Sequence, residues 1–164
     1  MTREINTVLA PWLSEANQAL ISRLLISHQR AFQQPLLQQH QNFHSMRTTA
    51  QELFASPIAV LAHDHSPDPL LTYANATALR IWGHRWSTMI GMPSRLTAEE
   101  SARRERASAL QQAQRVDGVN GYRGIRITRN GRRFVINNAR IWPLRDDNNN
   151  LCGQAAAISS WWWL

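Results

Sequence analysis

The chain has 164 residues with 18 basic residues, all of them arginine, against 11 acidic ones, so it can form one domain with an extension and carries a net charge of +7. Because the arginines are spread along the chain rather than gathered in one run, we expect a solvated basic surface and no nucleic-acid binding. The chain has one cysteine, Cys152, which excludes an internal disulfide framework. It contains no run of about 18 apolar residues, so we expect no membrane span. The residues after Met1 show no secretory pattern, and together these features indicate a cytoplasmic protein.

The first part of the chain, residues 1–50, is predicted to be a helical extension. Ser14 is a suitable N-cap, and apolar residues then recur at spacings near those of one helix face. These residues are Leu20, Ile21, Leu24, Leu25 and Phe32. Pro35 should break the helical pattern. A short helix is expected to open at the capping-box spacing Thr49-x-x-Glu52 and to stop before Pro57.

Residues 51–164 are predicted to form the main domain. A strand buried on both faces is expected over residues 58–63, followed by the turn HSPDP and a second strand over 70–73. Asn75 can cap a short helix that carries Trp82 and ends at Gly83. A longer helix should open at Thr97-x-x-Glu100 and run to about Arg115.

The last third of the chain is predicted to be three antiparallel strands. Asn130-Gly131 is typical of a two-residue hairpin loop, which would pair Ile127 with Phe134 and Ile125 with Ile136. Another turn is expected over residues 146–150, before a strand over 151–161. Five antiparallel strands with short helices on one face and the N-terminal helix on the other form an α+β fold. If two chains share the N-terminal cover, the protein is a homodimer.

Four segments of the chain carry a resemblance to a known family. They are AHDHSPDPLLTYANATALRIW, MPSRLTAEESARRERA, GYRGIRITRNGRRFVI and GQAAAISSW. Together, and in this order, they resemble the MEKHLA domain, a PAS-related family. Such domains occur as free-standing bacterial proteins and at the C-terminus of plant homeodomain–leucine-zipper transcription factors, whose DNA-binding parts this sequence does not contain. The resemblance implies a PAS-like five-stranded sheet and a sensory or regulatory role, but no particular ligand or reaction.

Three polar residues around the hairpin, Tyr122, Arg126 and Asn137, fall on one face of the sheet in the predicted register. A buried arginine among apolar neighbours needs a partner. Two hypotheses follow for Arg126. It could form an ion pair with an acidic residue such as Asp64 or Asp68, or it could clamp a carboxylate or another small anion.

Each of the other candidate ligand-binding residues could instead have a structural role. His63 and Asp64 are expected to be polar groups of a pocket or hydrogen-bonding groups at a strand end. Metal binding would need further ligands, which no spacing supplies either here or at His40-x-x-x-His44. Arg95, just before the longer helix, could bind an anion at the helix start or pair with Glu99 or Glu100.

Asn75 is predicted to be a helix cap in the first place, although it remains a candidate for ligand binding. Trp82 is either part of the core or an aromatic wall for a ligand. Gln154, in the closing strand, completes the candidate set. The consecutive tryptophans 161–163 cannot all face the core, because successive side chains of a strand point to opposite faces.

The sequence therefore predicts a PAS-like sensor that binds a small molecule between sheet and helices, forms a homodimer and signals through a partner protein. Two alternatives stay open. One is a ligand-free interaction or dimerisation module, and the other is a small enzyme with His63 and Asp64 as base and Arg126 as anion holder. No cofactor is assigned, because the Asn-Cys-Arg core of flavin-binding light sensors is absent and no haem-ligand signature is present.

Overall fold

The structure, a computed structural model, describes residues 10–37 and 45–164. The helical elements are η1 (Pro11–Leu13), α1 (Glu15–Phe32), α2 (Met46–Ala55), α3 (Ala76–Trp82), α4 (Trp86–Met89), η2 (Ser94–Thr97) and α5 (Glu100–Arg115). The strands are β1 (Ala59–Asp64), β2 (Leu71–Ala74), β3 (Val119–Ile127), β4 (Arg133–Arg145), β5 (Leu151–Ile158) and β6 (Ser160–Trp163). This order confirms the predicted succession of helices, two strands, short helices, one longer helix and a final group of antiparallel strands.

The strands form one antiparallel sheet in the order β2-β1-β5-β4-β3, and β6 also pairs with β4. β6 continues β5 after a single interruption at Ser159, so that β4 pairs with both of them along its length. The expected sheet of five antiparallel strands is therefore confirmed, with β6 as an added segment. The predicted division at residue 50 between an extension and the main domain stays a prediction.

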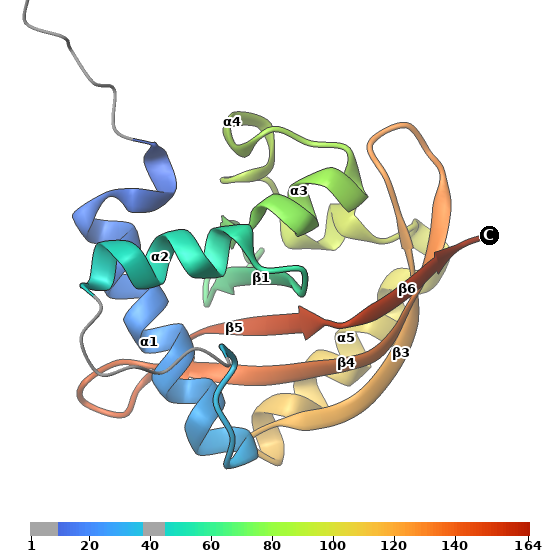
Figure 1. Ribbon diagram of the computed structural model, residues 1–164. Helices are drawn as coiled ribbons and strands as arrows, with labels where there is room; N and C mark the ends of the chain where they lie inside the picture. Colours follow the sequence, from blue (N-terminus) through green and yellow to red (C-terminus); the bar gives the residue numbers. More distant parts are fainter. Residues whose placement is uncertain (1–9, 38–44) are drawn as a thin grey trace, which may run out of the picture.

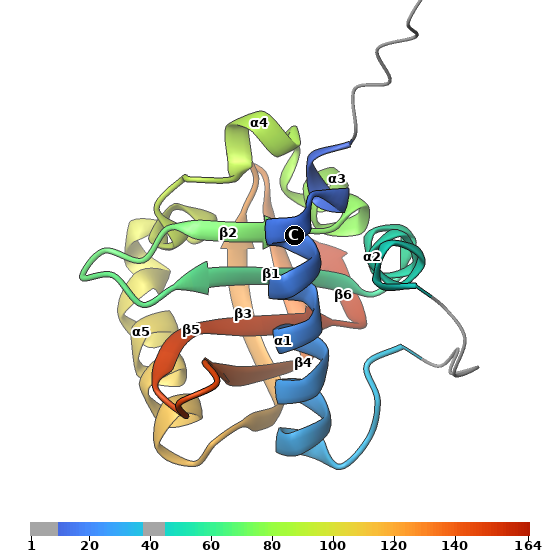
Figure 2. The same ribbon diagram turned by 90° about the vertical axis from the view of Figure 1, so that its left-hand side faces the viewer.

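One face of the sheet is covered by α1. Figure 2 shows this helix running across β1, β5 and β4. Its buried residues Ile21 and Leu24 pack in a core with Trp142 and Leu144 of β4, and the buried His28 ring contacts Trp142. Burial of a side chain such as Ile21 or Leu24 contributes roughly 1.5–3 kcal/mol. The prediction that the N-terminal helix covers one face of the sheet is confirmed.

The opposite face is covered by α3, α4 and α5, and Figure 1 shows α1 and α5 on opposite sides of the sheet. Trp82 of α3 is 1% exposed and meets Phe134 of β4 edge to face, with ring centroids 5.1 Å apart. The cover by α5 is thinner, because Ala113 is the one fully buried residue of this helix. This face therefore has a packed part under α3 and a loosely covered part under α5.

The predicted helix starts were correct at two of four positions. The Ser14 side chain accepts a hydrogen bond from Asn17 N, and Asn75 caps α3 by accepting from Ala78 N. The start predicted at Thr49 was wrong, because Ser45 caps α2 four residues earlier. The start predicted at Thr97 was also wrong, because that hydroxyl donates to Ser94 O instead and α5 begins without a side-chain cap.

The predicted register of the hairpin was wrong by one residue. Thr128 N donates to Arg132 O, and Gly131 adopts φ +83°, so the loop has three residues rather than two. Ile125 consequently pairs with Val135, and Arg126 with Phe134. The Thr128 hydroxyl stabilises the longer loop by accepting from Arg132 N at 3.0 Å.

A register shift of one residue moves side chains to the other face of a sheet. Ile125 and Val135 thus lie opposite the face that Phe134 shares with Arg126, contrary to the prediction. The prediction for the consecutive tryptophans was correct. Trp161 and Trp163 pack edge to face against Phe134, whereas Trp162 is 38% exposed.

Candidate ligand-binding cavity

A small cavity lies between the sheet and α5. Its volume is about 50 Å³, which corresponds to roughly four water-sized positions. Its walls are mostly apolar and include Leu61, Leu71, Ile136, Ala156 and Ile158. Four polar side chains of the sheet and one of α5 also line it, and these are His63, Gln154, Tyr122, Arg126 and Arg106. An apolar cavity with a few converging polar groups is the usual form of a small-molecule site.

Arg126 points into this cavity from β3 and is only 5% exposed. Its Nη1 donates to Ile125 O at 2.8 Å and its Nη2 donates to the Tyr122 hydroxyl at 3.3 Å. The Tyr122 hydroxyl in turn donates to Glu105 Oε2 at 2.8 Å. Since a guanidinium has five N–H donors, three donors of Arg126 have no partner in the described part of the chain.

The close approach of Tyr122 and Arg126 depends on Gly124 between them. A Cβ atom at position 124 would lie 2.5 Å from the Tyr122 hydroxyl oxygen and 3.0 Å from Arg126 Nη1. Burial raises the pKa of the Tyr122 hydroxyl, while the neighbouring Arg126 acts in the opposite direction. Tyr122 is therefore a neutral donor and acceptor at the edge of the cavity.

Arg106 reaches the same cavity from α5. Within residues 10–37 and 45–164, its guanidinium forms no hydrogen bond and no ion pair. Burial, and then the positive charge of Arg126, lower the pKa of Arg106 to about 10. Arg106 is thus still protonated at neutral pH, and two guanidinium groups repel one another across the cavity.

His63 contributes an unused acceptor. Its Nδ1 lies 2.7 Å from Asp64 O and must donate to it, because a carbonyl oxygen can only accept. Nε2 therefore carries a lone pair, and this buried atom has no partner among the described residues. Burial lowers the pKa of His63, the charge of Arg106 acts in the same direction, and the bond to Asp64 O acts against both. The imidazole is neutral at neutral pH.

Gln154 and Trp82 complete the cavity. Gln154 is 2% exposed, and its Nε2 donates to Leu110 O of α5 at 2.8 Å, so that β5 is joined to α5. Trp82 lines the cavity, and its Nε1 donates to Thr97 O at 3.2 Å. Five of the nine candidate ligand-binding residues thus come together here, namely His63, Trp82, Tyr122, Arg126 and Gln154.

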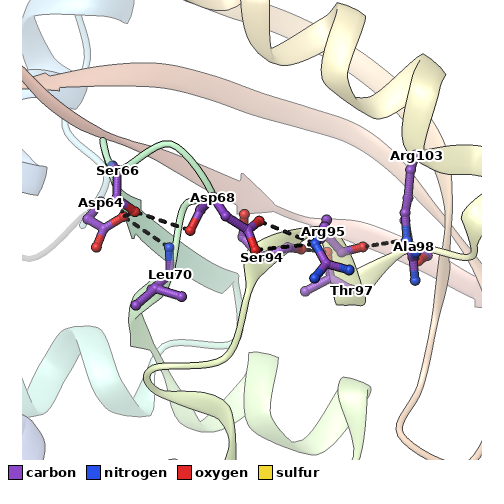
Figure 3. A network of polar contacts seen from close by, with 9 residues as sticks. All are labelled: Asp64, Ser66, Asp68, Leu70, Ser94, Arg95, Thr97, Ala98 and Arg103. Carbon is purple, nitrogen blue, oxygen red and sulfur yellow. Dashed lines mark hydrogen bonds and ion pairs between the residues drawn. The ribbon is translucent and has the colours of Figure 1, made fainter.

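Asp64 and Arg95 belong instead to a network that holds a surface turn, shown in Figure 3. Asp64 Oδ1 accepts from Ser66 N, from the Ser66 hydroxyl and from Leu70 N. Burial alone would raise the pKa of Asp64, but the hydrogen bonds from Ser66 and Leu70 outweigh this and lower it. The partner expected for Arg95 was wrong, because its Nε lies 3.2 Å from Asp68 Oδ1 rather than beside Glu99 or Glu100.

Two side-chain pairings expected from the sequence differ in the structure. The ion pair expected between Arg126 and Asp64 or Asp68 is not formed, since both carboxylates are engaged elsewhere. His63 also does not contact the Asp64 carboxylate, because its bond goes to the backbone carbonyl of that residue. A histidine–aspartate pair of the kind expected for a general base is therefore not assembled.

Asn75 and Asn137 lie outside the cavity. Asn75 is fully buried, and its amide makes four hydrogen bonds, to Val60 N, Ala78 N, Leu53 O and Ile58 O. This uses all of its donors and acceptors, so the residue joins α2, β1 and α3. Asn137 pairs with Ser160 of β6. The register expected for Asn137 was wrong, so it does not share a face with Tyr122 and Arg126.

Arg106 is the residue of the cavity that sequence reasoning missed. Its signal was present, because Ala102, Arg106, Leu110 and Ala113 recur at spacings of four and three and so share one helix face. A single arginine on the apolar face of a helix is expected to be buried and to need a partner. The surrounding run of arginines in α5 obscured this signal.

Metal binding and membrane insertion find no support in the described part of the chain. In residues 10–37 and 45–164, no three His, Cys, Asp or Glu side chains are grouped as for a metal ion. His40 and His44 lie outside the described residues. None of the described helices is long and apolar enough to cross a membrane.

Comparison with known proteins identifies the family and the fold. Residues 18–163 match the model of the MEKHLA domain. No curated protein matches the sequence. A PAS domain of a Colwellia psychrerythraea protein is 14% identical, with 68% of this chain and 92% of that chain covered and a TM-score of 0.61.

Two light-oxygen-voltage proteins are also similar in structure. One is an RNA-binding light-oxygen-voltage receptor, 18% identical, for which 76% of this chain and 35% of that chain are covered with a TM-score of 0.62. The other is a light-oxygen-voltage domain studied with a flavin analogue, 16% identical, with 71% and 84% covered and a TM-score of 0.53. At these identities, the similarity shows a PAS-like fold and nothing about ligands.

Proposed function

The chain belongs to the MEKHLA domain family, and we propose that it is a PAS-like sensory module that binds a small molecule between its sheet and α5 and signals through a partner protein. One observation carries this proposal. A cavity with mostly apolar walls encloses two arginine side chains and a buried imidazole nitrogen that is not hydrogen-bonded in the described structure. Buried polar groups without partners are costly, and a ligand that supplies partners stabilises the protein.

The position of the cavity supports a sensory role. Its walls come from the sheet on one side and from α5 on the other, through Arg106 and Leu110. A ligand that contacts both sides would favour the arrangement in which α5 lies against the sheet. A ligand shifts a conformational equilibrium only if its affinity for the two conformations differs. Contacts with α5 would therefore allow binding to change the position of this helix, and a partner protein could respond to that change.

Native mass spectrometry of freshly purified, untagged protein tests the ligand. We expect a mass excess that disappears on denaturation. Ala156→Leu should remove this excess, because the added carbons fill the cavity beside Leu61. Ala107→Leu, on the exposed side of α5, is the matched control and should retain it. Equal ligand retention by both variants would show that the molecule binds elsewhere.

An interaction module is the second candidate, and one surface favours it. Ile125, Val135 and Trp162 lie side by side across β3, β4 and β6. Ile125 is 40% exposed, and Trp162 is 38% exposed with the Arg123 guanidinium 4.7 Å from its ring centroid. Val135, between them, is only 7% exposed, so Ile125 and Trp162 supply the exposed apolar surface. Exposed apolar patches are typical of contacts between proteins.

We propose that the occupant of this surface is a second copy of the chain, since the same apolar row on each copy is self-complementary about a twofold axis. Sedimentation velocity should then show a dimer. Trp162→Ser should shift it to monomer, whereas the control Ile26→Ser, at an exposed position of α1, should not. A wild-type monomer at all concentrations would exclude this homodimer.

A further inference from the structure

We propose that Arg106 and Arg126 together bind a small oxyanion that carries a hydroxyl group, and that His63 Nε2 accepts the hydrogen bond from this hydroxyl. The inference deepens the proposed ligand-binding function and rests on it. It names the chemistry that the cavity selects, and it assigns a role to Arg106.

The charge of the cavity points to an anion. Two guanidinium groups line it. Burial is the main cause of the lowered pKa of Arg106, and the positive charge of Arg126 lowers it further. Within the described residues, neither has an ion pair with a carboxylate. An anion between them replaces this repulsion by two attractions, and guanidinium groups bind planar or tetrahedral oxyanions through paired N–H donors.

Glu105 is the carboxylate that competes with this interpretation. It lies on α5 next to Arg106, but it is exposed, and it contacts the Tyr122 hydroxyl rather than a guanidinium. Tyr122 thus separates Glu105 from Arg126. One exposed carboxylate, linked to Arg126 only through the Tyr122 hydroxyl, leaves the buried Arg126 and the half-buried Arg106 without a compensating charge inside the cavity.

The hydroxyl requirement comes from His63. Nδ1 is fixed as a donor by Asp64 O, so Nε2 is fixed as an acceptor, and it is buried with no partner in residues 10–37 and 45–164. The imidazole is 9% exposed and close enough to Arg106 for that charge to affect it. A carboxylate or sulfate offers no hydrogen for this nitrogen. A hydroxycarboxylate does, and so does a phosphate that retains one proton.

The size of the cavity limits the ligand. About 50 Å³ corresponds to roughly four water-sized positions, so the bound group is very small. The same chemistry can come from a short hydroxy acid or from inorganic phosphate. Either ligand would contact both Arg106 of α5 and Arg126 of β3, and would thereby hold the helix against the sheet.

Four sodium salts of the same number of non-hydrogen atoms test this inference on the full chain in Tris-chloride buffer at constant ionic strength. Glycolate has a hydroxyl group where propionate has a methyl group. Phosphate retains at least one proton at neutral pH, whereas sulfate retains none. We expect tighter binding by calorimetry for glycolate than for propionate, and for phosphate than for sulfate. A ligand at about 100 times its Kd should raise the Tm by roughly 5–10 °C.

The variants separate the three groups. Arg106→Ala and Arg126→Ala should each weaken glycolate and phosphate binding about 10- to 100-fold. Arg104→Ala, an exposed arginine of the same helix, removes the same charge and should leave the Kd unchanged. His63→Phe should abolish the preference for glycolate over propionate. If the wild-type protein prefers neither glycolate over propionate nor phosphate over sulfate, this result alone refutes the role of His63.

The stability of the ligand-free protein is an independent readout. Arg106→Met removes a desolvated, repelled cation and should raise its Tm by a few degrees. A lower Tm would mean that a group such as Glu105 already compensates Arg106, and would overturn the inference. If the arginine variants keep the ligand that copurifies with the wild type, the oxyanion site is wrong while the proposed function stands. If no salt binds the wild type at millimolar concentrations, the oxyanion site is likewise refuted.

Discussion

The two faces of the sheet each bury a histidine near an arginine, but they satisfy these groups differently. On the α1 face, His28 Nδ1 donates to Gln34 O at 3.0 Å, and Nε2 accepts from Arg140 Nη1 at 3.2 Å. On the α5 face, His63 has a partner for Nδ1 alone, and Arg106 contributes no hydrogen bond within the described residues.

The comparison shows that burial alone does not distinguish a ligand site from a core. His28 is fully buried and His63 nearly so. What differs is the hydrogen-bonding capacity that remains, together with the space around it. On the α1 side, the hydroxyl of Tyr73 and Nε1 of Trp142 also have no partner among the residues that the structure describes, but neither lines the cavity under α5. Unmet polar groups that converge on one cavity are therefore the informative observation.

The largest expected difference between the faces concerns packing. Leu24→Ala should cost about 2–5 kcal/mol of unfolding free energy, because Leu24 is fully buried in the α1-side core and leaves a void. Leu110→Ala, a half-buried leucine of α5 that already borders the cavity, should cost less than about 1.5 kcal/mol. Urea unfolding of both variants measures this, and equal losses would contradict the contrast between a filled face and a hollow one.

Acid should destabilise the α1 face through His28. Burial lowers the pKa of His28 to about 4, and the charge of Arg140 acts in the same direction, whereas the hydrogen bond that Nδ1 donates to Gln34 O acts against both. An unfolded chain binds the proton near pH 6.5 but the folded chain only near pH 4, so stability falls as the pH drops through this interval, by up to about 3 kcal/mol. His28→Gln lacks this titration. Unfolding free energies of the two proteins from pH 7.5 to about 4 should therefore converge, and parallel curves would show that His28 is not responsible.

Truncation of the arginines on the two faces should affect stability to different extents. Arg140→Ala leaves His28 Nε2 buried without a donor and should cost about 1–3 kcal/mol. Arg126→Ala removes a cation from the cavity, so the ligand-free protein should still fold with little change in Tm while ligand retention is lost. Thermal unfolding with native mass spectra compares them. If Arg126→Ala unfolds the domain, Arg126 is structural in the way that Arg140 is.

The smallest effect is expected at Gly124. An alanine there would displace the ends of the Tyr122 and Arg126 side chains, both of which are flexible, so the loss of stability should stay below about 1 kcal/mol. Glycolate affinity should nevertheless fall several-fold, because Arg126 moves. In a Tyr122→Phe background, where the hydrogen bond is already absent, Gly124→Ala should have a smaller effect on affinity. Additive effects would mean that this hydrogen bond does not position Arg126.

Local signals in the sequence predicted most of the fold. Ser14 and Asn75 act within one helical turn, and the alternation of strands and helices follows from short-range patterns. The hairpin register could not be predicted in the same way. A two-residue type I′ loop needs a positive φ at both Asn130 and Gly131, but of the two only Gly131 has one, and the Thr128 hydroxyl supports the longer loop.

The cavity was only partly predictable for a related reason. Arg126 was identified because it lies among apolar strand residues, but its expected acidic partners were already bound in the turn that Asp64 organises. Arg106 and Arg126 are brought together by the docking of α5 on β3 and β4, a contact between distant segments that no local pattern encodes. The polar groups of a site can thus be recognised one at a time, whereas their convergence requires the tertiary structure.

The thin packing of α5 has a kinetic consequence. Amide hydrogens exchange with solvent when their own cooperative unit opens, and the cost of opening follows the contacts that the unit buries. Ala113 is the one fully buried residue of α5, whereas every residue of β1 except Asp64 is buried. Amides of α5 should therefore exchange much faster than those of β1. Brief local unfolding of this helix, with the sheet intact, would give a solute a route into the space beneath it.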